Sequence, residues 1–173
     1  GSFIGYLNSS QQIFQEQFGT GKMFTVYFGL LALVFGVASL MNSRFVERLG
    51  MQYICIRSFT AIIAISVLFL GVHAVADIQL WMFLLYAALL FCAFGLLFGN
   101  LNALAMEPMG HIAGIAAAVI GASSSLLSLV LGTAIGQFYN GTLVPILCGF
   151  IVLGALALAA LLYAQGLKSR AGA

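Results

Sequence analysis

Few side chains in this sequence have the type and spacing needed for acid–base, nucleophilic or metal chemistry. The four acidic residues and two histidines are scattered along the chain, and no serine–histidine–acid set falls in one aqueous compartment. No glycine-rich phosphate loop precedes a helix. His73 and Asp77 are one turn apart but resemble no metal site, and the remaining carboxylates are too scattered to build one. Cys55, Cys92 and Cys148 lie in apolar stretches, and their spacing matches no metal or redox motif. We therefore expect no enzymatic activity, no metal site and no cofactor.

Charged residues are also absent from long parts of the chain. The stretch from Pro108 to Leu167 contains no Asp, Glu, Lys or Arg. Hydrophobic residues make up 63% of the sequence and charged residues 6%, whereas soluble domains are about a quarter charged. A helix needs about 20 apolar residues to cross the hydrocarbon core of a bilayer. The 173 residues therefore allow about six spans with short loops, and no room is left for a second, soluble domain.

We predict an all-α integral membrane protein whose spans end at charged or turn-forming residues. Asp77 closes the third span, and Glu107 and Pro108 end the fourth. We expect the run from Asn42 to Gly50 to be a polar loop. We interpret the first segment, Ser2 to Phe18, as the end of a membrane helix whose beginning is missing. The expected spans are 2–18 (partial), 23–43, 54–76, 80–106, 111–138 and 143–164.

The positions of lysine and arginine predict an orientation. Cytoplasmic loops of membrane proteins carry an excess of these residues. The first, third and fifth connections contain only Lys22. The second and fourth connections and the tail together contain the other five basic residues: Arg44, Arg48, Arg57, Lys168 and Arg170. We therefore expect a multi-pass protein with its C-terminus in the cytoplasm.

Small residues recur at helical spacing in the second, fourth and fifth spans. Lipid gives helices no hydrophobic reason to associate, so close packing of small residues must supply the attraction. Gly95 and Gly99 form a GxxxG pair in the fourth span. Two interpretations stay open for the second and fifth spans: packing within one bundle, or smooth surfaces along which two bundles rock. The glycines concerned are Gly29, Gly36, Gly114, Gly121 and Gly132.

Polar residues near the predicted cytoplasmic face support two further hypotheses. Asn100 and Asn102 either line a cavity or cap neighbouring helices, because an intramembrane polar group needs a partner or water. Arg44, Arg48 and Glu107 are expected on the same membrane face. They form either a charge cluster that acts as a cytoplasmic latch or separate, solvated loop charges.

Two runs of residues resemble the major facilitator superfamily. The run from Asn42 to Gly50 is similar to the superfamily's G-x-x-x-D-R-x-G-R-R motif in its second copy, after the eighth helix. In that comparison Ser39 takes the first glycine position, Ser43 takes the aspartate position, and Arg44 and Arg48 match the motif.

The later run from Asn100 to Ala118 (NLNALAMEPMGHIAGIAAA) is more specific. It resembles the junction of the tenth and eleventh helices in drug:proton antiporters of the bicyclomycin-resistance type. The run from Phe14 to Gly19 (FQEQFG) resembles the end of that family's seventh helix. The resemblance covers essentially the whole chain and corresponds to the C-terminal half of a twelve-helix carrier.

The resemblance implies where the chain meets its partner and its substrate. In this superfamily the eighth and eleventh helices, here the second and fifth spans, face the other half. The seventh, eighth, tenth and eleventh helices line a central cavity. Aromatic residues on these helices are the candidates to contact an apolar or cationic drug: Tyr6, Phe14, Tyr86, Phe94 and Phe98.

We accordingly expect half of a proton-coupled multidrug exporter in a bacterial inner membrane. Its expected partners are the missing N-terminal half, membrane lipid and a small apolar or cationic drug, and we expect no nucleic acid. The proton site is expected in the N-terminal half, because no acidic residue lies near the bilayer centre here. Two alternatives are an exporter of a small metabolite, such as a sugar or amino-acid derivative, and a membrane assembly module that transports nothing.

Overall fold

The computed structural model describes residues 1–171, with side chains as far as Leu167. This part of the chain is helical and contains no strand. A π-helical turn, Ile13–Gln17, extends the first helix, and 3-10 turns cover Gly21–Met23 and Glu107–Ile112. The α-helices are α1 (Ser2–Gln12), α2 (Phe24–Leu49), α3 (Met51–Val75), α4 (Leu80–Met106), α5 (Ala113–Gln137) and α6 (Val144–Ala171).

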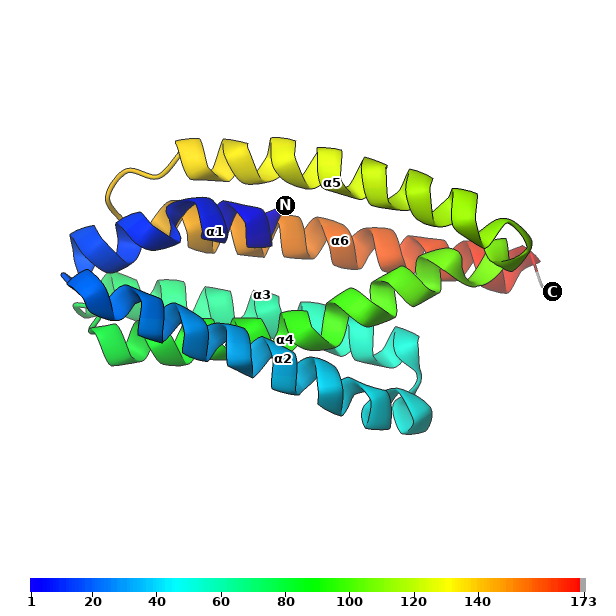
Figure 1. Ribbon diagram of the computed structural model, residues 1–173, viewed down its shortest axis with the longest axis horizontal. Coiled ribbons are helices and arrows are strands. Elements are labelled where there is room, and N and C mark those ends of the chain that lie inside the picture. The colour runs from blue at the N-terminus through cyan, green and yellow to red at the C-terminus, as the bar shows by residue number, and fades with distance from the viewer. Residues whose placement is uncertain (172–173) are drawn as a thin grey trace.

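Four helical stretches are long and apolar enough to cross a membrane. The longest of them comprises α4 and α5, which run in opposite directions after the backbone turns at Met109 (φ −114°, ψ 21°) (Figure 1). By length and composition these helices belong to an all-α, multi-pass membrane protein. The four stretches are Gly21–Leu49, Met51–Val75, Leu80–Gln137 and Val144–Leu167.

The expectation of a polar loop between Asn42 and Gly50 is wrong, because α2 continues through this segment to Leu49. Arg, Glu and Leu are good helix formers, and the segment has no glycine or proline before Gly50. The Ser43 hydroxyl donates to the Leu40 carbonyl oxygen (2.8 Å) and so stays on the helix surface. The chain turns only at Gly50, whose φ of 79° suits a residue without a side chain.

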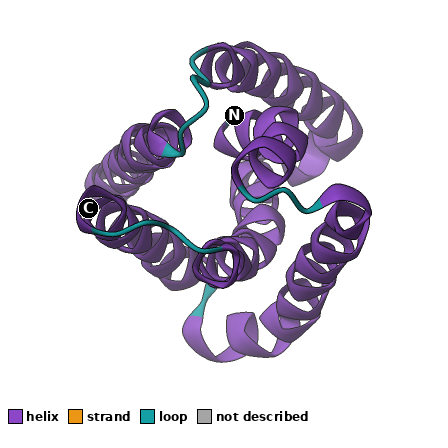
Figure 2. Ribbon diagram, turned by 90° about the vertical axis from the view of Figure 1, so that its left-hand side faces the viewer, coloured by secondary structure: helices purple, strands orange, loops and turns teal. Residues whose placement is uncertain are grey.

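The helices run alternately in opposite directions along the long axis of the bundle, and Figure 2 shows them end-on. The closest packing joins α2 to α4, α1 to α5, α3 to α4 and α3 to α6, and α1 also packs on α6. When each helix is exchanged for the one three places later (α1 with α4, α2 with α5, α3 with α6), α2–α4 becomes α1–α5, α3–α4 becomes α1–α6, and α3–α6 becomes itself. The units α1–α3 and α4–α6 therefore pack as inverted repeats, since α1 and α4 run in opposite directions (Figure 1).

Glycines make the two equivalent contacts, α2 with α4 and α1 with α5, very close. A Cβ atom added at Gly95 of α4 would lie 2.6 Å from the carbonyl oxygen of Phe35 in α2. A Cβ atom at Gly132 of α5 would lie 2.5 Å from Cγ2 of Ile4 in α1. Gly132 thus packs inside this bundle, and the expectation that it faces a second bundle is wrong.

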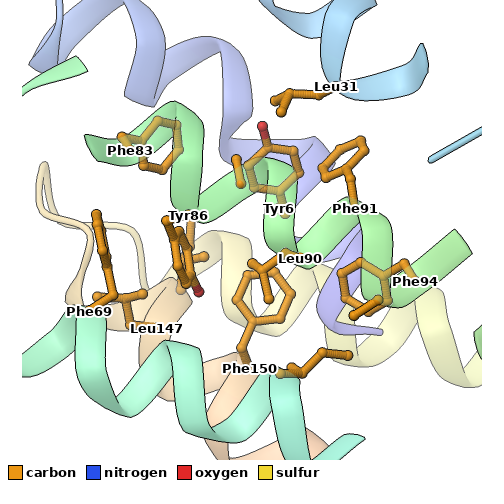
Figure 3. Packing of buried hydrophobic residues seen from close by; sticks show 14 of the residues in the cluster. Tyr6, Leu31, Phe69, Phe83, Tyr86, Leu90, Phe91, Phe94, Leu147 and Phe150 are labelled. Carbon is orange, nitrogen blue, oxygen red and sulfur yellow. The ribbon is translucent and has the colours of Figure 1, made fainter. Parts of the chain in front are cut away.

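Aromatic side chains fill the space between the two repeats. Figure 3 shows Tyr6 beside Phe91 of α4, with ring centroids 5.4 Å apart, and the Tyr6 hydroxyl directed toward Leu31 of α2. Phe94 of α4 packs on Phe150 of α6, with centroids 5.8 Å apart. The core therefore holds residues from several helices at once, and it fixes α4 and α1 in the middle of the bundle.

Candidate functional site

Three of the five aromatic candidates are packed inside the protein: Phe14 and Tyr6 lie in the core, and Tyr86 packs against α3. Phe14 is fully buried against Phe24, Phe83 and Tyr27. The Tyr6 side chain is 2% exposed, and its hydroxyl has no hydrogen-bond partner among the described residues. Neither residue lines a cavity described below.

Tyr86 faces α3 instead of the bundle's central space. Its ring stacks on Phe69, with centroids 4.3 Å apart and an interplanar angle of 11°. Its hydroxyl lies 3.0 Å from the Ser66 hydroxyl, and both groups are buried. Tyr86 also borders a cavity of about 190 Å³ beside Trp81 on the outer face of α3 and α4. This arrangement stabilises the contact between α3 and α4.

Phe94 and Phe98 do line hollow space, which lies beside Gly1 at the start of α1. One cavity of about 640 Å³ lies among α1, α3, α4, α5 and α6, and both rings border it. A second cavity of about 480 Å³ lies between α1, α4 and α5, and Phe98 borders it too. The two cavities share Phe3, Phe98 and Ser128 as lining residues, and we call them together the central cleft. Their volumes are in the range of sites that take small molecules.

Three rings from three helices meet beside the central cleft, and two of them, Phe3 and Phe98, line it. Phe3 of α1 lies 6.2 Å from Phe35 of α2 and 5.8 Å from Phe98 of α4, measured between centroids. Phe35 and Phe98 are 5.9 Å apart, so the three rings form a closed triangle. All three are partly accessible, and Phe98 is 45% exposed. We call Phe3, Phe35 and Phe98 the ring triangle.

Hydroxyl groups also line the central cleft. Ser124, Ser125 and Ser128 of α5 line the smaller cavity together with Phe3 and Phe98, and we call these serines the serine row. Among the described residues that line either cavity, none is Asp, Glu, Lys, Arg or His. The central cleft therefore offers ring faces and neutral hydrogen-bonding groups but no side-chain charge.

Most of the small-residue stripe on α2 and α5 is open. A Cβ atom added at Gly29, Gly36, Gly114 or Gly121 would meet nothing within 4 Å. Large apolar side chains on the same helices are also exposed, such as Leu33 (63%). Helices that present small and apolar residues to the outside of a bundle can approach another helix or lipid closely.

The motif residues of α2 lie at the end of the bundle where α2 and α4 finish (Figure 1). The backbone N of Ser39 lies at the α2–α4 contact, 3.2 Å from a Cβ atom built at Gly95. Arg44 and Arg48 lie one helical turn apart, and both side chains are exposed.

Glu107 reaches the same end from α4. Its exposed side chain lines a hollow of about 380 Å³ with residues of the turn between α2 and α3, Leu49 to Tyr53. The expected latch residues are thus at one end of the fold. The backbones of Lys168 and Arg170 belong to α6, and their side chains lie outside the described residues.

Asn100 joins α4 to α2 beneath that end. It is 2% exposed, and its side-chain amide nitrogen donates to the side-chain oxygen of Asn42 (2.8 Å) and to the Leu96 carbonyl oxygen (2.7 Å). Asn102 donates only to the Phe98 carbonyl oxygen on its own helix (3.0 Å). The cavity hypothesis for Asn100 is therefore wrong, because this side chain links two helices.

The opposite end of the bundle holds the end of α1 against the turn between α5 and α6. The Gln17 amide nitrogen donates to the Gly141 carbonyl oxygen (3.1 Å) and lies 3.4 Å from the Tyr139 hydroxyl. Burial raises the pKa of Tyr139, the hydrogen bond from Gln17 lowers it, and the neighbouring Glu16 carboxylate raises it. This end therefore carries a polar cluster, and the exposed Glu16 carboxylate is part of it.

No group of three metal-ligating side chains occurs in the part of the chain that the structure describes. Comparisons with protein-family models, with curated proteins and with solved structures each find no match. The resemblance to the major facilitator superfamily therefore stays a prediction.

Sequence reasoning missed Phe3, Phe35 and the serine row. The serines were visible as part of a small-residue stripe, and Ser123 to Ser125 form the only run of three hydroxyl residues in α5. That run in an apolar span was a usable signal. Phe3 and Phe35 had none, because their meeting depends on how α1, α2 and α4 cross.

Proposed function

We propose that this chain is the C-terminal six-helix half of a major facilitator carrier of the bicyclomycin-resistance type. In this proposal it joins an N-terminal half in a bacterial inner membrane and exports small drugs in exchange for protons by alternating access. The observation that carries the proposal is the inverted-repeat packing of α1–α3 and α4–α6.

Inverted repeats are common in secondary transporters, and in this superfamily they are nested within each six-helix half. Substrate sites in such carriers lie near the bilayer midplane at a repeat interface. The central cleft lies between the two repeats, with walls from α1, α3, α4, α5 and α6, whereas the resemblance places the substrate cavity on the helices that correspond to α1, α2, α4 and α5. The proposal thus explains the packing pattern.

The open faces of α2 and α5 supply the surface for the other half. They occupy equivalent places in the two repeats, and Gly29, Gly36, Gly114 and Gly121 leave room for a neighbouring helix. Small residues let two bundles slide past each other with little change in contact, as rocking requires. Ser39, Ser43, Arg44, Arg48 and Glu107 would then limit the motion at the cytoplasmic end.

Proton coupling is assigned to the N-terminal half. All four carboxylates of this chain are exposed and lie near helix ends, outside the apolar middle of the bundle. A carboxylate that exchanges protons during transport needs a partly desolvated site, which raises its pKa. This half is therefore expected to supply substrate contacts and the moving surface.

The test compares this chain alone with the same chain joined to its N-terminal half, each reconstituted in vesicles. With an imposed proton gradient, the joined protein should accumulate a lipophilic drug and the chain alone should not. Transport by the chain alone would contradict the proposal. So would a joined protein that transports neither drugs nor neutral sugars and amino-acid derivatives. The latter result favours an assembly module.

A further inference from the structure

We propose that Asn140, in the turn that joins α5 to α6, is a site of spontaneous covalent modification. Its side-chain amide is lost through a cyclic imide formed with the backbone nitrogen of Gly141, and the asparagine becomes aspartate or isoaspartate. This chemistry belongs to the chain itself and does not depend on the proposed function.

The backbone nitrogen of Gly141 is open to the reaction. Gly141 is exposed, lies outside any helix and carries no side chain that would shield its nitrogen from the preceding residue. A Cβ atom built there would meet nothing within 4 Å. The nitrogen donates no backbone hydrogen bond within the part of the chain that the structure describes. It can therefore lose its proton to hydroxide without first breaking a bond to the protein.

Two donors from Thr142 hold the side-chain oxygen of Asn140. The Thr142 backbone N–H donates to Oδ1 of Asn140 (3.2 Å), and the Thr142 hydroxyl donates to the same oxygen (2.6 Å). Negative charge develops on this oxygen when a nucleophile adds to the amide carbon. Donors that already point at it stabilise that charge. The turn thus places an activated carbonyl directly before an unshielded backbone nitrogen.

The steps balance with water as the only co-reactant. The Gly141 nitrogen gives its proton to hydroxide and forms a bond to Cγ of Asn140, and the side-chain nitrogen takes up a proton and leaves as ammonia. Water then adds to one of the two carbonyl carbons of the cyclic imide, and the bond from that carbon to the ring nitrogen breaks. Opening at Cγ gives aspartate, and opening at the backbone carbon gives isoaspartate.

The other asparagines of the chain lie inside helices and serve as internal controls. They are Asn8 in α1, Asn42 in α2, and Asn100 and Asn102 in α4. A helix engages the backbone nitrogen of the following residue in a hydrogen bond to the carbonyl four residues earlier, so that nitrogen is not available for attack. Asn42 is the closest match, because a small residue, Ser43, follows it.

The modification acts on the contact between α1 and this turn. The Gln17 side chain donates to the Gly141 carbonyl oxygen (3.1 Å), and the Glu16 carboxylate interacts with Tyr139. Aspartate at position 140 adds a second carboxylate next to Tyr139, and like charges repel. Isoaspartate also lengthens the backbone before Gly141. Both products therefore weaken the hold of this turn on the end of α1.

The experiment incubates the purified chain in detergent at mildly acidic and mildly alkaline pH and follows each asparagine by peptide mapping with mass spectrometry. Labelling by a protein isoaspartate methyltransferase detects the isoaspartate product. We expect Asn140 to be converted over time, faster at the higher pH, while Asn42 stays intact in the same samples. Conversion of Asn42 as fast as Asn140, or no conversion of Asn140, overturns the proposal.

Two variants test the geometry of the turn. Gly141→Ala should slow the conversion at least about tenfold, because a Cβ atom shields the nitrogen and a φ of 80° disfavours alanine. Thr142→Val keeps the side-chain shape but removes the hydroxyl donor, and it should slow the conversion about three- to tenfold. Circular dichroism shows whether each variant keeps its helices.

Thr60→Val is the matched control, because the Thr60 hydroxyl donates only to the Ile56 carbonyl oxygen on its own helix (2.8 Å). It should leave the rate at Asn140 unchanged. An unchanged rate in Gly141→Ala overturns the imide route. A rate in Thr142→Val that equals or exceeds that of the unmodified sequence overturns the role of the two donors. These readouts involve no transport, so their failure is distinct from a failure of the proposed function.

Discussion

Gly95 and Gly99 are one turn apart on α4, and the structure predicts opposite effects when each is replaced by alanine. A Cβ atom at Gly95 would lie 2.6 Å from the Phe35 carbonyl oxygen, 2.9 Å from Cβ of Ala38 and 3.2 Å from the Ser39 backbone nitrogen. A Cβ atom at Gly99 would meet only the side-chain nitrogen of Asn42, at 3.9 Å. The two substitutions are chemically identical, so Gly99→Ala is a matched control for Gly95→Ala.

The magnitude follows from these distances. Ordinary contacts begin near 3.4 Å, so α2 must move away from α4 by about 0.8 Å to admit the new methyl group at Gly95. Two of the three clashing atoms are backbone atoms of α2, and no change of rotamer relieves them. Overpacking of this kind costs about 1–3 kcal/mol.

Both substitutions gain about 0.5–1 kcal/mol because alanine favours a helix over glycine. That gain cancels when the two variants are compared, and the packing cost of about 2 kcal/mol remains. We expect Gly95→Ala to melt about 4–8 °C below Gly99→Ala.

The assay is thermal unfolding of the purified chain in one detergent, followed by circular dichroism and by loss of the monodisperse peak. Gly132→Ala should behave like Gly95→Ala, because Gly132 makes the equivalent contact with Ile4 in the other repeat. Equal melting temperatures for Gly95→Ala and Gly99→Ala would refute the close α2–α4 contact.

Further predictions concern other helix contacts. Asn100→Ala should lower the free energy of unfolding of the purified chain by about 0.5–1.5 kcal/mol, whereas Asn102→Ala should change it little, because only Asn100 bonds to another helix. Equal effects of the two substitutions in a melting assay would contradict this prediction. Gly121→Leu should change the melting temperature of the chain by less than about 2 °C, because a side chain at this position meets nothing within the bundle. The same substitution should abolish transport by the proposed complete carrier. Transport at the normal rate would show that α5 does not face the other half. Cys148 is exposed and Cys55 is fully buried, so N-ethylmaleimide in detergent should label Cys148 more than about tenfold faster than Cys55. Mass spectrometry that shows Cys55 labelled first would contradict the packing of α3.

The all-α membrane class could be predicted from the sequence because it depends on the absence of charged residues from long apolar stretches. The stretch from Pro108 to Leu167 would give a soluble fold no charged surface, whatever the details of packing. The polar run after Asn42 was harder to interpret. Its charges suggested a loop, yet nothing in it stops a helix before Gly50, so α2 extends beyond its apolar part.

The site could be predicted only in part, because an aromatic residue in an apolar helix carries no sign of the direction it faces. Tyr6, Phe14 and Phe98 looked alike in the sequence, but the first two are buried in the core and the third borders the central cleft. Glycine spacing was ambiguous in the same way. Gly121 faces open space and Gly132 packs on α1, although both belong to one stripe on α5.

The most direct test of the central claim uses single cysteines at Gly36 and Gly121 in the complete carrier, otherwise free of cysteine, in membrane vesicles. The account predicts that an aqueous maleimide labels the two positions at rates that change when drug is added or the proton gradient is reversed, as the two halves rock. Labelling that stays constant under all these conditions at both positions would contradict an alternating-access carrier.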